Sequence, residues 1–105
     1  MLGALNSPRR SSSEFYTPYT DQELTFGAAA SSQLDPVKLA SCKMIVLRVI
    51  SGDARFRVIG VDASASEGAT MFAGDIVILN RFEADRLSGI RGGSTDCVVW
   101  ATYYR

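Results

Sequence analysis

The side chains of this 105-residue chain that could do chemistry are two cysteines, a scatter of serines and eleven carboxylates. A cysteine or serine nucleophile needs a neighbouring base, and histidine is the usual one. The sequence has no histidine, no Gly-x-Ser-x-Gly elbow and no Gly-Lys-Ser/Thr loop for phosphates. We therefore expect a protein that is not an enzyme and that holds no cofactor.

The carboxylates and cysteines form no pattern typical of an acid–base pair or a metal site. Glu83 and Asp85 fall on different sides of a predicted helix, so their carboxylates do not converge. Cys42 and Cys97 are far apart and form no Cys-x-x-Cys unit, which argues against a zinc or redox motif. A disulfide between the two cysteines and a pair of inert, buried thiols are both open interpretations.

Charge and hydropathy argue against nucleic-acid and membrane partners. Eleven basic residues balance eleven acidic residues, so the chain has no net charge with which to attract phosphates. The longest apolar stretches, such as 44–47, are far shorter than a membrane span, and the apolar start is too short for a signal peptide. We expect a soluble protein, made in the cytoplasm, that binds other protein subunits.

The chain divides into two unlike parts. Residues 1–33 show no strand or long amphipathic helix in their pattern, yet they hold several aromatic residues, which are rare in disordered tails. We predict an extended arm over residues 1–33 that docks on its own domain or on a neighbouring subunit. A flexible tail with incidental aromatic residues is the alternative. The candidate docking residues of the arm are Phe15, Tyr16, Tyr19 and Phe26.

Residues 34–105 are predicted to form a small, mainly β domain. Asp35 can cap a helix that begins at the following proline, so one or two helical turns are expected, packed on the core through Val37, with Leu39 or Ala40 as further candidates. Apolar residues on both faces of 44–50 indicate a central strand that is covered on both sides. Alternation over 55–61, after a Ser-Gly-Asp turn, predicts that these two strands form a hairpin.

The remaining strands are shorter and are separated by glycine-rich turns. The run 76–79 follows a Gly-Asp turn and is interpreted as a buried strand. Residues 80–89 favour a short helix that Asn80 caps and Gly89 closes; a strand followed by a hairpin is the alternative. The last strand is expected over 96–105. The fold class is therefore a small antiparallel sheet or partly open barrel with an extended N-terminal arm.

Further side chains in this domain are candidates for partner binding. Arg55 and Arg57 share one face of their strand, where they are either solvated or paired with acidic groups of a partner. In the last strand, alternation places Trp100 and Tyr104 on one face and Tyr103 on the other. We assign Trp100 to the core, so one of the two tyrosines is expected to face a partner or the arm.

Two motifs carry a family resemblance. A Gly-Asp turn opens the strand in Gly74–Leu79, and a glycine-rich turn leads into the final strand in Gly92–Trp100, near a basic C-terminus. In these features residues 71–105 resemble small head-completion and head–tail attachment proteins of tailed bacteriophages. The predicted helix at 80–89 departs from their pattern, in which a hairpin is expected.

The aromatic, proline-interrupted arm is similar to that of capsid decoration (cement) proteins, which staple neighbouring shell subunits with extended termini. The resemblance implies a non-enzymatic structural protein of a virion. Its partners would be capsid or neck proteins and copies of itself, in a homo-oligomeric assembly without direct contact to nucleic acid or membrane.

A second interpretation is a small cytosolic sensory or ligand-binding module. The helix start at 34–36 followed by the run Phe56–Gly60 is similar to parts of some PAS-like domains. That interpretation needs a pocket inside a five-stranded sheet. It predicts a monomer with a bound small molecule, whereas the assembly interpretation predicts many identical copies in contact.

Overall fold

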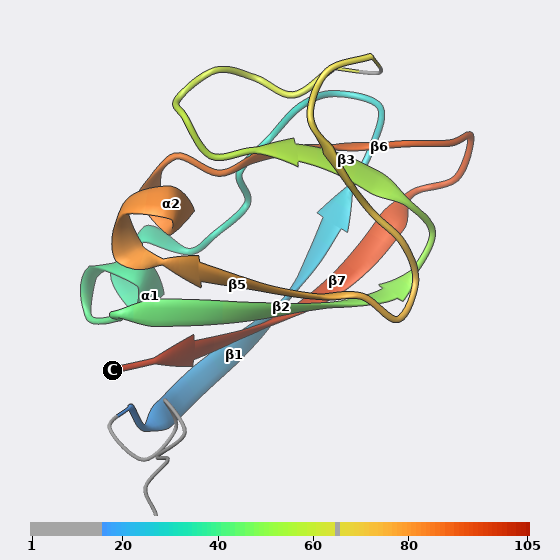
Figure 1. Cartoon of the computed structure of the whole chain (residues 1–105). Helices are drawn as coiled ribbons and strands as arrows, with labels where there is room; N and C mark the ends of the chain where they lie inside the picture. The colour runs from blue at the N-terminus through green and yellow to red at the C-terminus, as the bar shows by residue number, and fades with distance from the viewer. Residues whose placement is uncertain (1–15, 65) are drawn as a thin grey trace, which may run out of the picture.

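The computed structural model describes residues 16–64 and 66–105, which form seven strands and two short helices (Figure 1). The larger sheet has the order β1-β7-β2-β5 and the smaller sheet the order β4-β3-β6, with antiparallel pairing throughout. The predicted mainly β class is confirmed, and the two sheets do not close into a barrel. The strands are β1 Pro18–Phe26, β2 Met44–Ser51, β3 Ala54–Arg57, β4 Ala69–Met71, β5 Ile76–Asn80, β6 Ser88–Arg91 and β7 Cys97–Tyr104.

The hydrophobic core lies between the two sheets. Alternate side chains of each strand point to opposite faces, so each strand of the larger sheet turns one set of residues inward. Full burial of a large apolar side chain of this kind contributes roughly 1.5–3 kcal/mol to stability. The largest fully buried side chains are Tyr103, Phe26, Leu24, Ile45, Leu47, Met71, Val49, Val99 and Cys97.

The first helix, α1, spans Pro36–Ala40 and begins where the sequence predicts. The carboxylate of Asp35 accepts a hydrogen bond from the backbone N–H of Val37 at 2.8 Å, which satisfies an otherwise unpaired donor. The expected packing is wrong for Val37, which is 79% exposed, and is confirmed for Leu39. Leu34, just before the helix, is also buried.

The second helix, α2, spans Arg81–Asp85 and has the predicted capping box. The Asn80 side chain accepts from the Glu83 N–H, and the Glu83 carboxylate accepts from the Asn80 N–H, both at 2.9 Å. The helix is shorter than predicted, because Gly89 pairs with β3 as part of β6 and does not close the helix. Among the described residues, no helix is long and apolar enough to cross a membrane.

The predicted hairpin between 44–50 and 55–61 is wrong. β2 pairs with β5 and β7, whereas β3 pairs with β4 and β6 in the other sheet. The chain passes from one sheet to the other at Gly52, whose φ is +77°. A Cβ atom at this position would lie 2.6 Å from the backbone oxygen of Asp96, so the corner closes tightly against the segment before β7. Alternation identifies a strand but does not identify its neighbours.

For the part of the predicted arm over 1–33 that the structure describes, the docking is on the chain's own domain, one of the two predicted possibilities, but it is made by a strand that the sequence pattern did not indicate. β1 pairs antiparallel with β7, with one irregularity near its start, and the segment after it bridges to β6. Leu24 and Phe26 are fully buried, so β1 completes the core of its own domain and the boundary at residue 33 cuts through that domain. The strand was hard to predict because only these two apolar residues show the alternation. Phe15 and the rest of 1–15 lie outside the described residues.

Candidate protein-binding surface

One side of the larger sheet faces away from the core, and we call it the outer face. Residues directly opposite each other on neighbouring strands point to the same side of a sheet, so the register defines the members of this face. Three rows cross it: Glu23, Trp100, Arg48 and Ile76; then Asp21, Thr102, Val46 and Ile78; then Tyr104, Met44 and Asn80.

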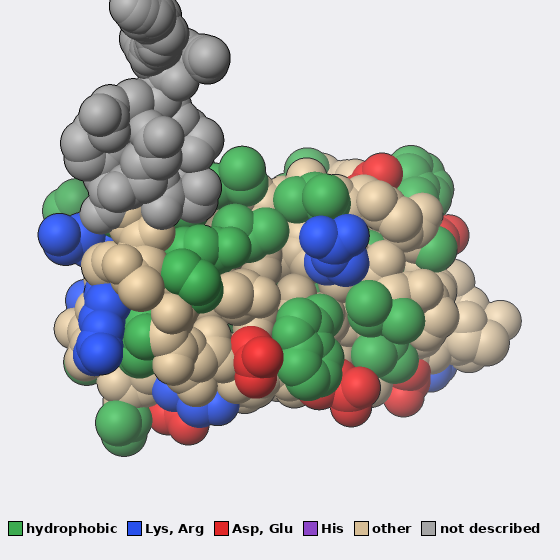
Figure 2. Space-filling model, turned by 90° about the horizontal axis from the view of Figure 1, so that it is seen from below, with side chains coloured by type: hydrophobic (Ala, Val, Ile, Leu, Met, Phe, Trp, Pro, Cys, Tyr) green, Lys and Arg blue, Asp and Glu red, His purple; other side chains and the backbone are tan. Residues whose placement is uncertain are grey.

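The outer face carries exposed apolar side chains on β7 and on the edge strand β5. An antiparallel sheet with one side on the core normally turns polar residues to the other side. Here Ile76 is 52%, Ile78 62% and Trp100 39% exposed. Figure 2 looks onto this side and shows hydrophobic side chains gathered around a basic one, with acidic side chains along one border. Apolar patches of this kind on a protein surface mark interaction sites.

The outer face suits a broad partner surface better than a small ligand. Small-molecule sites are concave, and none of the described residues line a pocket. Nor does the described part of the chain contain a group of three or more histidine, cysteine or acidic side chains that could hold a metal ion. Arg48 is exposed in the middle of the apolar rows, and no carboxylate of the described residues forms an ion pair with it.

The structure inverts the predicted orientation of the last strand. Trp100 and Tyr104 do share one face of β7 and Tyr103 does point the other way, so the alternation is confirmed. The inward side, however, is that of Tyr103, which is fully buried, and Trp100 lies on the outer face. The assignment of Trp100 to the core is therefore wrong, and Tyr103 faces Tyr19 and Gln22 of the predicted arm rather than a separate partner. Tyr104 is half-buried on the outer face.

Tyr103 can be buried because its hydroxyl group has partners. It donates to the side-chain oxygen of Gln22 at 2.6 Å and accepts from the backbone N–H of Asp35 at 3.2 Å. The same Gln22 oxygen also accepts from Asp35 at 3.1 Å, so the hydroxyl ties β7, β1 and the start of α1 together. Burial raises the pKa of Tyr103 to about 12, because the phenolate would lose its hydration.

We expect the stability of the protein to fall between pH 10 and 12 through Tyr103. Its pKa is raised on folding, so the contribution is fully present below pH 10 and is lost as the pH rises through about 12. The loss amounts to about 2–3 kcal/mol at the upper end. Urea unfolding of the wild-type protein and of Tyr103→Phe at several pH values measures it. The variant should lack this fall, and parallel pH profiles of the two proteins would contradict the assignment.

The tyrosines predicted to dock on a partner contact their own chain. The Tyr19 ring packs edge-on against Tyr103 with 6.4 Å between the ring centroids, and the guanidinium carbon of Arg105 lies 4.5 Å from its centroid. The Tyr16 ring lies 6.0 Å from the ammonium group of Lys43. Both rings are half-buried within the chain itself. Phe26, the remaining described candidate of the arm, belongs to the core.

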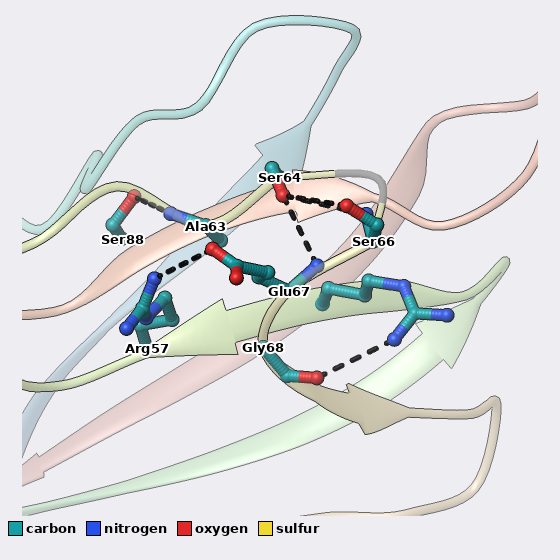
Figure 3. A network of polar contacts seen from close by, with 8 residues as sticks. Arg57, Ala63, Ser64, Ser66, Glu67, Gly68 and Ser88 are labelled. Atoms are coloured by element: carbon teal, nitrogen blue, oxygen red, sulfur yellow. Dashed lines mark hydrogen bonds and ion pairs between the residues drawn. The ribbon is translucent and has the colours of Figure 1, made fainter.

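Arg55 and Arg57 hold a loop of the chain itself. The Arg57 guanidinium lies 3.4 Å from the Glu67 carboxylate, and Arg55 donates to the backbone oxygen of Gly68 at 3.4 Å (Figure 3). Both acceptors belong to the loop between β3 and β4, which returns over the smaller sheet (Figure 1). These contacts explain the two arginines without a partner, and the structure does not bring them together with the outer face.

Cys42 and Cys97 are free thiols, and both are buried. Burial raises the pKa of each thiol above its ordinary value, which keeps it protonated and unreactive. The question left open by the sequence is therefore answered in favour of two inert thiols.

Sequence reasoning missed the exposed apolar residues of the outer face, and of that face it singled out Tyr104 alone. Trp100 was assigned to the core, and Ile76 and Ile78 to a strand buried within the chain. The signal was present, since both faces of 44–50 and of 76–79 are apolar. Coverage of both faces by the chain itself was the wrong interpretation, because the smaller sheet covers only the inner side of the larger one (Figure 1).

Comparisons with known proteins found no relative of this chain. No family model, curated protein or solved structure matches this chain. The functional argument therefore stands on the outer face and on the residues of the sequence. The four- and three-stranded sheets also differ from the five-stranded order that the PAS-like interpretation needs.

Proposed function

We propose that this chain is a non-enzymatic structural protein that joins an assembly by packing the outer face of its larger sheet against another protein subunit. One observation supports this most directly: Ile76, Ile78 and Trp100 stand exposed on a sheet face that no described element covers at its centre. Burying the exposed half of such a side chain contributes about 0.8–1.5 kcal/mol. Several of them together offer a partner a substantial gain in binding free energy.

The assembly that the sequence suggests is the particle of a tailed bacteriophage, with the chain as a capsid decoration or head-to-tail connector protein of the virion. This finer proposal rests on the resemblance of residues 71–105 and on the zero net charge. In such a particle the outer face would make the contact between subunits. Residues 18–26 would not extend onto a neighbouring subunit, because β1 belongs to the chain's own sheet.

Site-specific photo-crosslinking tests the proposal. A photoreactive phenylalanine at position 78 of the full chain, in the cell or particle in which the chain is naturally made, is expected to form adducts with protein peptides. Mass spectrometry then identifies those peptides, whether they come from this chain or from another protein.

Ile59 provides a matched control for this experiment. It is an isoleucine with the same 62% exposure as Ile78, but it lies after β3, away from the outer face. Adducts at position 59 should be several-fold fewer. Equal yields at the two positions, or adducts at position 78 mainly with nucleic acid or lipid, would contradict the proposed function.

A further inference from the structure

The edges of the larger sheet are poorly suited to pairing with another chain. At the free edge of β1, the side-chain amide of Gln33 accepts from the Thr25 N–H at 2.9 Å and donates to the Thr25 carbonyl. Two of the backbone groups that a new strand would use along β1 are therefore occupied. The opposite edge, β5, has only five residues, and short edge strands limit pairing. A partner of this sheet is therefore expected to pack on its face.

The Trp100 row of the outer face carries a distinctive arrangement of charge. Glu23, Trp100 and Arg48 lie directly opposite one another on β1, β7 and β2. Neighbouring strands are about 4.8 Å apart, so the acidic and the basic residue flank the indole at one strand spacing each. The whole chain has a formal net charge of zero, so two copies do not repel each other over long range.

We propose that the subunit on the outer face is a second copy of this chain, related by a two-fold axis that runs parallel to the strands between β7 and β2. This inference rests on the proposed function and names its partner. The rotation places the β7 of one copy over the β2 of the other, and all four strands overlap. Trp100 then faces Arg48 of the other copy, Thr102 faces Val46, and Tyr104 faces Met44, each contact occurring twice.

These contacts are complementary in chemistry. A guanidinium over the face of an indole is a favourable cation–π contact. The Glu23 carboxylate lies one strand from the indole, so the same guanidinium is also within reach of an acidic partner. A methionine thioether beside a tyrosine ring is likewise favourable. Two sheets packed face to face in this way form the two layers of a sandwich with roughly aligned strands.

The charges also select this axis over its perpendicular alternative. A two-fold axis across the strands, along the Trp100 row, would place each residue of the row against its own copy. Arg48 would face Arg48 and Glu23 would face Glu23, and like charges at an interface oppose binding. The axis along the strands instead sets Arg48 over Trp100 and Glu23 over Ile76 of the other copy, so no like charges face each other directly, and each contact occurs twice, as a two-fold axis requires.

Charge reversal in the full chain tests the dimer. Analytical ultracentrifugation over a concentration series should show a dimer for the wild-type protein. Glu23→Arg and Arg48→Glu each place like charges together twice, and each should weaken the dimer by about 10- to 100-fold. Mixing the two variants restores opposite charges at both contacts, so the mixture should form a heterodimer of near wild-type affinity. Arg86→Glu, at an exposed position after α2, should leave the dimer unchanged.

The heterodimer is the decisive readout, because a structural role within one chain cannot produce it. A monomeric wild-type protein, a dimer that is indifferent to the charge reversals, or the absence of a heterodimer would overturn the inference. A monomeric protein whose position 78 crosslinks to a different protein would overturn the dimer alone and leave the proposed function standing.

Discussion

Phe26→Ala is expected to lower the free energy of unfolding by about 3–5 kcal/mol, a large share of the total stability of a domain of this size. Phe26 is fully buried although it lies near the N-terminus of the described chain. Its ring packs where Gly89 of β6 passes, so closely that a Cβ atom at position 89 would lie 2.6 Å from the ring. The ring therefore fills the space between the larger and the smaller sheet, and its removal leaves a cavity between them.

Urea denaturation followed by circular dichroism measures this effect. Phe82→Ala is the matched control, because Phe82 is 73% exposed on α2 and its truncation should change stability by less than about 0.5 kcal/mol. If β1 were a detachable docking arm, both variants would behave like the control. Similar, small effects of the two substitutions would contradict the role of β1 in the core.

Gly52→Ala is expected to destabilise the protein by about 2–4 kcal/mol. An alanine at a φ of +77° costs about 1 kcal/mol, because its Cβ crowds the backbone. The added Cβ would also lie 2.6 Å from the backbone oxygen of Asp96 and 3.0 Å from the Cα of Cys97. Backbone atoms in a paired segment cannot move aside cheaply, so overpacking adds about 1–3 kcal/mol.

Gly60→Ala separates these two contributions. Gly60 has a φ of +85°, and nothing lies within 4 Å of the position of its Cβ. This variant therefore has the backbone cost alone, about 1 kcal/mol. Chemical denaturation of both variants, with Trp100 as the single tryptophan reporter, gives the comparison. Equal losses would show that the corner between the two sheets is not closed by the contact with 96–97.

Local sequence features were predictable wherever the physical cause is itself local. Asp35 and Asn80 cap the helices as expected, because a side-chain oxygen needs only the next two or three backbone N–H groups to do so. The strands over 44–50 and at the C-terminus were predictable from their β-branched and aromatic residues. The absence of histidine and the balanced charge also led directly to an expectation of a binding protein rather than an enzyme.

The candidate surface was not predictable, because the tertiary structure decides which side of a strand is inside. Alternation correctly separated Trp100 from Tyr103, but either side could have faced the core. The polar partners that Tyr103 finds in Gln22 and Asp35 are far from it in sequence, and they make its burial possible. These hydrogen bonds let Tyr103 take the inward side of β7, and Trp100 therefore lies on the outer face.

The sequence by itself therefore determined the strand-rich composition and the helix starts, since each of these depends on residues within a few positions of one another. The tertiary structure alone decided that β1 belongs to the core, that β2 and β3 lie in different sheets, and that an apolar face remains uncovered by the described elements. Strand pairing and burial join residues many positions apart. Alternation along the chain therefore shows which residues share one face of a strand, but not which strands lie beside it or which face is buried.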